Sequence, residues 1–393
     1  MRRFLAALLL SASPTWADDT TTSGLIAEQG LSAARAELES ASASADRDMA
    51  LAAVLFLSGI ENAYQERWRI GATSPLFPAP VLGTELEPPN PSPDPMQSDF
   101  LNGIADELIN AMRASREALP ETEGSLVLHL PDLWFDIDGN GNRGPSEGLL
   151  ELVMIPMPEG VDGKIRFDAA DTEWLRAYTH LIEAICTLLL AFDPEPALAR
   201  NIELAEALHQ QFSTPTGKAS PGEHMPTDAM DLGPIVDMAA VAIHTLRNQP
   251  DKAMIRESQQ HLVQMIGANR NFWEMVAEET DNTREWIPND SQQAALGFDI
   301  PKGAGQAWVA VLDDAELVLR GERLIPFWRF AEGYGIDLQK WIDDPQPIDL
   351  VSWIQGSAAL PYTRSGKMVD RRSWSDFTEM FMGRAGLYMV LFN

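Results

Sequence analysis

The sequence predicts a mainly α-helical protein with a small β element, built as one large helical domain or as two helical lobes that carry one calcium loop. Three observations lead to this fold class. Apolar residues recur at helical spacing over most of the chain. Only short stretches, such as residues 125–130 (SLVLHL), have the composition of a strand. Two segments rich in proline, glycine or serine separate the helical regions.

The first residues have the pattern of a secretory signal peptide. Arg2 and Arg3 form a positively charged start, residues 4–10 are apolar, and residues 15–17 place small side chains at the −3 and −1 positions of a cleavage site. We therefore expect cleavage near Ala17 and a periplasmic or secreted protein. The apolar stretch is too short to span a bilayer, and we expect no transmembrane segment in the mature chain.

The predicted regions follow one another in a simple order. The segment after the N-terminal helices contains eight prolines between Pro75 and Pro95, which excludes a helix there. The expected order is a signal peptide at 1–17, an N-terminal helical hairpin at 18–71, a Pro-rich linker at 72–97, a helical region with the calcium loop at 98–212, a loop at 213–230, and a C-terminal helical region rich in tryptophan at 231–393.

Helical spacing also gives the individual helices. In the hairpin we expect helices over 24–42 and 46–69, and in the middle region over 98–118, 170–192 and 196–212. In the C-terminal region we expect them over 233–248, 251–268, 271–281, 304–320 and 373–391.

Charge and cysteine content limit the functions that fit. The chain has 29 lysines and arginines against 58 aspartates and glutamates, which gives a net charge of −29. Because a nucleic-acid binder needs a basic surface to release counterions, we expect no nucleic-acid partner and leave an unknown protein or carbohydrate ligand open. The single cysteine, Cys186, cannot form an internal disulfide, so we expect it in a large apolar core.

One motif is specific. Residues 136–147 (DIDGNGNRGPSE) match the D-x-[DN]-x-[DN]-G-x5-E calcium pattern at each defined position. Ca²⁺ is a hard cation that takes roughly six to eight oxygen ligands, and Gly141 permits the tight turn that brings the ligands together. The expected ligands are Asp136, Asp138, Asn140, the backbone carbonyl of Asn142, and Glu147, with both carboxylate oxygens.

This twelve-residue stretch resembles the loop of the EF-hand family. The sequence departs from that family at Arg143, where a small apolar residue is usual, and Pro131 and the strand-like residues 125–130 argue against a regular entering helix. A single loop also lacks the paired hand through which sensors open and close. The resemblance therefore implies bound Ca²⁺ that stabilises the fold, in a protein whose role is non-enzymatic binding or structural.

One alternative is an exported carbohydrate-active hydrolase or lyase. The carboxylates at 278–285 are crowded beside Trp286, and paired carboxylates do acid–base chemistry on glycosidic bonds. Crowding also raises the pKa of at least one carboxyl group, as a general acid requires. The candidate residues are Glu278, Glu279, Asp281 and Glu285.

A second alternative is iron handling. His180 and Glu183 form an H-x-x-E on one face of the predicted helix at 170–192. This motif is similar to the H-x-x-E of imelysin-type periplasmic proteins, and the resemblance implies an iron site at these two residues. Tyr178 stands where that family has glycine. Glu206 and His209 are half of a di-iron pattern, for which the sequence has no second E-x-x-H.

Overall fold

The computed structural model describes residues 21–73, 84–152, 157–212, 233–381 and 384–392. It is mainly helical with a small β element, which confirms the predicted fold class. The predicted signal peptide at 1–17 and the predicted loop at 213–230 lie outside the described residues.

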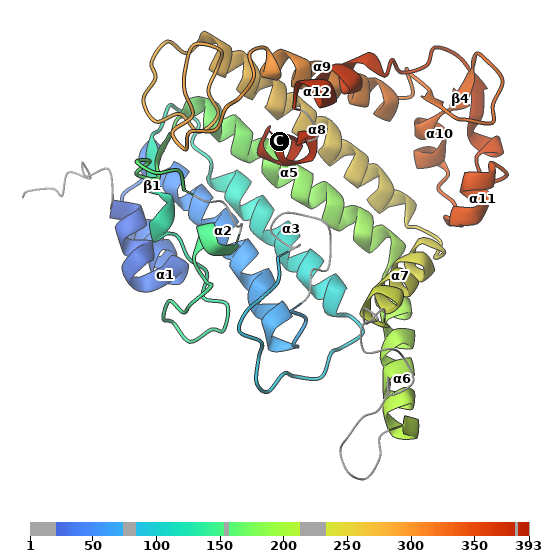
Figure 1. The fold of residues 1–393 in the computed structure, drawn as a ribbon, viewed down its shortest axis with the longest axis horizontal. Helices are drawn as coiled ribbons and strands as arrows, with labels where there is room; N and C mark the ends of the chain where they lie inside the picture. Colours follow the sequence, from blue (N-terminus) through green and yellow to red (C-terminus); the bar gives the residue numbers. More distant parts are fainter. Residues whose placement is uncertain (1–20, 74–83, 153–156, 213–232, 382–383, 393) are drawn as a thin grey trace, which may run out of the picture.

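Four long helices lie side by side across the centre of the molecule (Figure 1). Their contacts run in the order α2, α3, α5, α8, so that α3 and α5 are the inner pair. Their bounds are Ala45–Arg69 for α2, Phe100–Ala118 for α3, Ala169–Phe192 for α5 and Lys252–Glu278 for α8. On the outer sides, α1 (Thr21–Ser40) packs on α2, α9 (Ala304–Leu319) packs on α8, and α12 (Arg372–Met380) packs on α9.

Two hydrophobic cores meet at α5. The first joins α1, α2, α3 and the residues that flank the loop at 136–147, and it includes the buried Cys186 of α5, as predicted. The second joins α8, α9, α12 and α13 (Ala385–Phe392), and it includes Ala170 and Ala177 of α5. By length and composition α5 is the one described helix that could span a membrane, but a buried core helix meets the same criteria.

Two small antiparallel sheets complete the frame. The strand β1 (Leu126–His129), within the predicted stretch 125–130, pairs with β2 (Lys164–Phe167), with Leu126 opposite Phe167. The second sheet has the order β3-β4-β5, with bounds Ile325–Pro326, Tyr334–Ile336 and Thr363–Ser365. Between β1 and β2 lie the short 3-10 helix η1 (Leu130–Asp132), the loop at 136–147 and α4 (Leu149–Leu152).

The predicted breaks between helices in the C-terminal region are wrong. The predicted helices at 251–268 and 271–281 form the single helix α8. Asn269 lies in the predicted gap and is helical, and its side chain donates to the carbonyl of Phe392 (2.6 Å) and accepts from the indole of Trp308 (3.1 Å). Conversely, the predicted helix at 373–391 is divided into α12 and α13. Phe381, at the end of α12, stacks on Tyr388 of α13, with ring centroids 4.1 Å apart.

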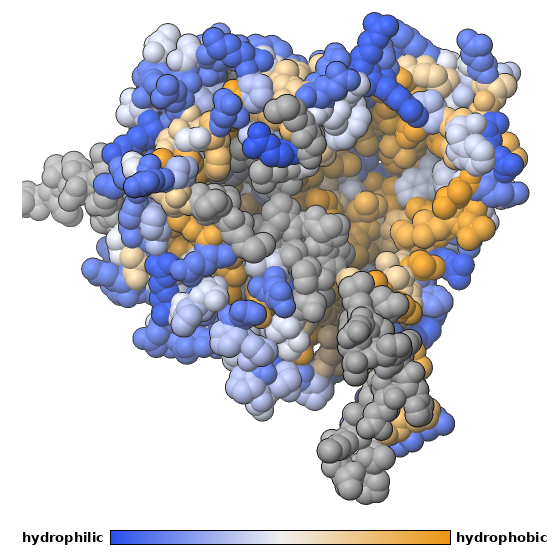
Figure 2. Space-filling model, viewed as in Figure 1, coloured by the Kyte–Doolittle hydropathy of each residue, from blue (hydrophilic) through white to orange (hydrophobic). Residues whose placement is uncertain are grey.

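The remaining helices extend to one side. Here α6 (Glu195–Phe212) and α7 (Gly233–Leu246) project from the body, and α10 (Leu338–Asp343), α11 (Leu350–Gln355) and the 3-10 helix η2 (Leu360–Tyr362) lie beside the second sheet (Figure 1). Figure 2 shows apolar residues gathered on this face between the central helices and α11, inside a mostly hydrophilic rim. Exposed apolar side chains of these elements include Ile185 on α5 and Val351 and Ile354 on α11.

Candidate metal centres

The loop at 136–147 is closed at its base by backbone pairing. The amide of Phe135 donates to the carbonyl of Glu147, and the amide of Leu149 donates to the carbonyl of Leu133, both at 2.9 Å. The chain enters the loop from β1 and η1, so the expectation that no regular helix precedes it is confirmed. This pairing fixes the last ligand of the motif opposite the first.

Within the loop, side-chain oxygens accept hydrogen bonds from backbone amides and form tight turns. Asp136 Oδ2 accepts from the amide of Gly141 (3.0 Å), Asp138 Oδ1 accepts from the amide of Asn140 (3.1 Å), and Asn140 Oδ1 accepts from the amide of Asn142 (2.7 Å). Gly141 has a φ of 75°, a conformation that a residue with a Cβ rarely adopts. Such turns, in which a side chain accepts from an amide two or more residues later, bring alternate side chains toward one centre.

The predicted carboxylates converge. Asp136, Asp138 and Glu147 each contribute an oxygen that lies within 4.8 Å of the others. Glu147 is buried and accepts from the amides of Ile137 (2.9 Å) and Gly144, and burial raises its pKa. Within the described part of the chain, the buried Asp136 Oδ1 has no hydrogen-bond partner. A buried carboxylate oxygen is costly without a partner, and a cation among these three groups would supply one.

Arg143, the departure from the EF-hand pattern, lies away from these oxygens. Its guanidinium donates to the carbonyl of Pro131 at 3.0 Å, at the base of the loop. The positive charge is therefore held by a backbone carbonyl.

Helix α2 supplies two residues that the sequence reasoning missed. Glu61 Oε2 accepts from the amide of Asp136 (2.8 Å), and the side-chain amide of Gln65 donates to the carbonyl of Asp136 (2.7 Å). Burial, together with the charges of Asp136 and Glu147, raises the pKa of Glu61 to about 7. A signal was present, because helical spacing places Glu61 on the apolar face of its helix, where a carboxyl group is unusual.

A tryptophan ties the same loop to α1. The indole of Trp134 donates to the carbonyl of Ile26 at 2.6 Å, and the side chain is 2% exposed. Gly30 interrupts α1 with a φ of 80°, and a Cβ there would lie 3.3 Å from the indole ring. The base of the loop therefore contacts both helices of the N-terminal hairpin.

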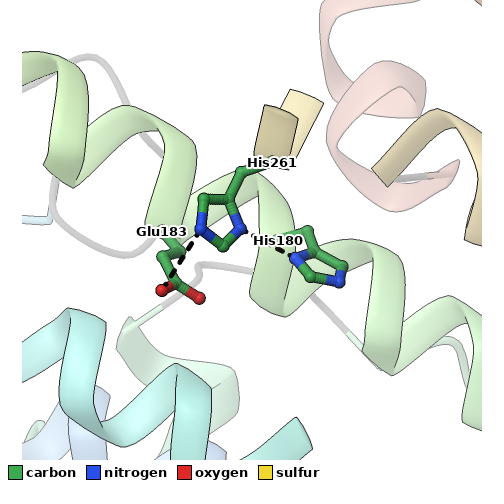
Figure 3. Close-up of side chains that lie close together, drawn as sticks. All are labelled: His180, Glu183 and His261. Atoms are coloured by element: carbon green, nitrogen blue, oxygen red, sulfur yellow. Dashed lines mark hydrogen bonds and ion pairs between the residues drawn. The ribbon is translucent and has the colours of Figure 1, made fainter. Parts of the chain in front are cut away.

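A second cluster lies at the centre of the molecule, between α5 and α8 (Figure 3). His180 Nδ1 lies 2.9 Å from His261 Nδ1, and His261 Nε2 lies 3.4 Å from Glu183 Oε1. The three residues present ligand atoms that are all within 4.8 Å of one another. The H-x-x-E of α5 thus gains a histidine 81 residues later in the chain, which no local sequence pattern could have indicated.

Two arginines of α3 contact the carboxylate of this cluster. Arg116 donates to Glu183 Oε2 (2.6 Å), and Arg113 donates to Oε1 (2.9 Å). Burial acts to raise the pKa of Glu183, but the hydrogen bond and charge of Arg116 outweigh it and lower the pKa. The carboxylate is therefore ionised at neutral pH although its side chain is only 1% exposed.

Both histidines are neutral at neutral pH. Burial, followed by the charge of Arg116, lowers the pKa of His180 to about 3, and burial also lowers the pKa of His261. Neutral imidazole is the form that binds transition metals. The cluster therefore offers a metal ion two neutral imidazole nitrogens and one ionised carboxylate oxygen.

The acidic residues at 278–285 do not share one cavity. Glu279 and Glu285 lie with Asp168 in a third carboxylate cluster, in which burial raises the pKa of Glu279 to about 7. Asp281 is exposed and pairs with Arg166, at 3.1 Å. Glu278 lines a cavity of about 570 Å³ in which no described tryptophan takes part.

The remaining sequence pattern, the E-x-x-H of Glu206 and His209, lies on the surface. Glu206 and His209 are exposed on the projecting helix α6. The clusters of potential metal ligands found among the described residues do not include them.

Comparison of the chain with known protein families, with curated proteins and with solved structures finds no match. The resemblances of 136–147 to an EF-hand loop and of His180 and Glu183 to the imelysin motif therefore stay predictions. What the structure adds is geometry: each motif lies in a cluster of converging ligand atoms.

Proposed function

We propose that this chain is an exported calcium-binding helical protein, in which Ca²⁺ bound at 136–147 stabilises the fold. The observation that carries the proposal is the convergence of Asp136, Asp138 and Glu147, together with the buried Asp136 oxygen that has no partner in the described chain. The signal-peptide pattern at 1–17 supports a periplasmic or secreted location. Glu61 and Trp134 connect the loop to α2 and α1, so the ion stabilises the N-terminal hairpin.

Thermal unfolding with calcium or with a chelator tests this role. At a calcium concentration about 100-fold above Kd, binding stabilises the folded chain by about 2.7 kcal/mol, and we expect the Tm to rise by several degrees. Exported calcium modules bind in the range of about 10⁻⁴–10⁻³ M, so calorimetry at millimolar calcium measures Kd. Magnesium is expected to stabilise less, because it requires a smaller and more rigid site.

Glu147→Gln is the matched variant. It keeps one of the two acceptors, for the amide of Ile137 or that of Gly144, but removes the charge, and it should abolish the calcium-dependent rise in Tm. Glu151→Gln is the control, because Glu151 is exposed and accepts from Gly148 outside the ligand set. No binding heat for the wild type, or an equal response of wild type and Glu147→Gln, contradicts the proposal.

A second function is favoured by the cluster of His180, Glu183 and His261. We also propose that these residues bind a divalent transition-metal ion. Two imidazoles and one carboxylate with open positions favour Fe²⁺, in agreement with the iron that the H-x-x-E resemblance implies. Both histidines are neutral and the carboxylate is ionised, so the cluster needs no deprotonation to bind a metal at neutral pH.

One arginine must move for the metal to bind. Arg116 is mostly buried and holds Glu183 Oε2, whereas Arg113 is 48% exposed and holds Oε1. The outer side chain can swing into solvent and free Oε1, the oxygen that faces His261. Arg113→Met should therefore raise the metal affinity, since it removes both a competitor and a nearby positive charge.

Titration with Co²⁺ and, without oxygen, Fe²⁺ tests this second function. Calcium at about ten times its measured Kd is present throughout, so that the loop is occupied. We expect one equivalent to bind, and His180→Ala and His261→Ala each to lower the affinity by at least roughly 100-fold, since even outer partners of metal ligands contribute about 10–100-fold. His209→Ala is the control because His209 is exposed on α6. Wild-type affinity in both cluster variants contradicts the proposal and leaves the calcium function untouched.

A further inference from the structure

A cavity of about 630 Å³ lies between α8 and α9, and residues 288–291 and 300–301 form its third wall. Small-molecule sites have volumes of roughly 300–1,000 Å³. Among its described lining residues there is none from the calcium loop or from the histidine cluster. The cavity is therefore a separate candidate site.

One part of the wall is apolar and closely packed. Trp273 and Val276 of α8 face the cavity together with Ile300 and with Val309 of α9. Gly305 brings the α9 backbone against the indole, because a Cβ at that position would lie 2.4 Å from Trp273 Cε3. Side chains of this kind contact the apolar face of a ring-shaped ligand.

Unused hydrogen-bond donors belong to the same wall. In the first turn of α9, the amides of Ala304 and Ala307 donate to the carbonyls of Pro301 and Gly303. Within the described chain this leaves the amides of Gly305 and Gln306 as the donors without an acceptor, and Gly303 at the N-cap provides no side-chain acceptor. Gly305 and Gln306 of this turn line the cavity. A ligand with oxygen acceptors satisfies such donors.

The charges of the wall exclude an anion as the preferred ligand. Arg270 is its one lining cation among the described residues, and it is already paired with Asp313 (2.7 Å) and Glu316. Glu274 and Asp290 also line the cavity. Asp290 Oδ1 already accepts from the amide of Gly303 (2.8 Å), so Asp290 Oδ2 and the carboxylate of Glu274 are the oxygens that can accept from hydroxyl groups. A phosphate or carboxylate would meet net negative charge, whereas a cation would leave the donors unused.

We propose that this cavity binds a neutral mono- or disaccharide. Such a molecule combines an apolar ring face, which fits the wall of Trp273 and Val309, with hydroxyl groups that both donate and accept. The carboxylates of Glu274 and Asp290 accept from these hydroxyls, and the first turn of α9 donates to them. This binding function is independent of the calcium loop and uses none of the crowded carboxylates at 279–285.

Calorimetric titration of the full, calcium-saturated chain with D-glucose, D-galactose, maltose and cellobiose tests the proposal. We expect saturable binding of at least one of them below about 10 mM. Ala310→Trp fills the cavity from an exposed lining position and should abolish binding, with a Tm close to that of the wild type. Ala36→Trp, at an exposed position on α1, is the matched control and should bind normally.

A second pair of variants tests the polar contacts. Glu274→Ala should weaken binding at least tenfold, while Glu278→Ala, one turn further along α8 and outside this cavity, should not. D-gluconate should bind more weakly than D-glucose because it is an anion. No saturable heat with any of the four sugars, full binding by Ala310→Trp, or tighter binding of D-gluconate overturns the proposal.

Discussion

Replacing Glu183 with leucine is expected to lower the free energy of unfolding by about 3–5 kcal/mol, measured by urea denaturation in the presence of a chelator. The carboxylate of Glu183 is almost completely buried, and it is the anion for Arg116, whose side chain is 15% exposed. Without it, the guanidinium is left in the core with only Thr179 Oγ1, at 3.4 Å. An uncompensated buried charge is among the most destabilising changes that a single substitution makes.

Two further variants separate two effects: the cost of leaving the charge of Arg116 buried without a partner, and the loss of the Glu183–Arg116 ion pair itself. Arg113→Leu is expected to cost no more than about 1 kcal/mol, because Arg113 is half exposed and Glu183 keeps Arg116. The double variant Glu183→Leu with Arg116→Leu should recover most of the lost stability, since apolar side chains often replace a buried ion pair without net cost. A Glu183→Leu chain as stable as Arg113→Leu would show that water reaches the arginine and that the pair is not buried in solution.

The sequence was sufficient to predict that carboxylates within one short loop converge. Asp136, Asp138 and Glu147 converge because one loop contains all three, and its turns depend on their own side chains. Glu61 and His261 could not be found in this way, because they reach their clusters through the packing of separate helices. A residue type alone does not indicate such a role, and the partner is decided only when the helices pack.

The same distinction explains the fold predictions. Periodic helices such as α2 and α3 were predicted closely because their apolar faces repeat every turn. Helix α8 continues through Asn269, whose side chain bonds to Phe392 and Trp308 in distant segments. The strand β2 was missed because its four residues form a strand only beside β1. Tertiary contacts decided these features, and local propensity did not.

Trp134→Ala is expected to lower the free energy of unfolding by about 3–5 kcal/mol and to weaken calcium binding as well. The side chain is buried against Gly30, and its indole donates to the carbonyl of Ile26. Trp134 also pairs with Gly148 at the base of the loop, next to the ligand Glu147. Without the Trp134 side chain, the position of Glu147 relative to Asp136 is less well fixed. We expect the calcium Kd to rise by about 10-fold, as for other groups that support metal ligands.

Trp134→Phe isolates the hydrogen bond from the packing. It keeps an aromatic ring against α1 but leaves the Ile26 carbonyl without its donor, so the expected loss is about 1–3 kcal/mol with a smaller change in calcium affinity. Trp374→Ala, at a position that is 45% exposed, controls for the loss of a tryptophan at the surface. Calorimetry and urea denaturation on the same samples give both quantities. Trp134→Ala could instead lose the expected stability and bind calcium with wild-type affinity. That result would mean that the hydrogen bonds within the loop are enough to hold it, and it would contradict the proposal that packing on α1 affects calcium binding.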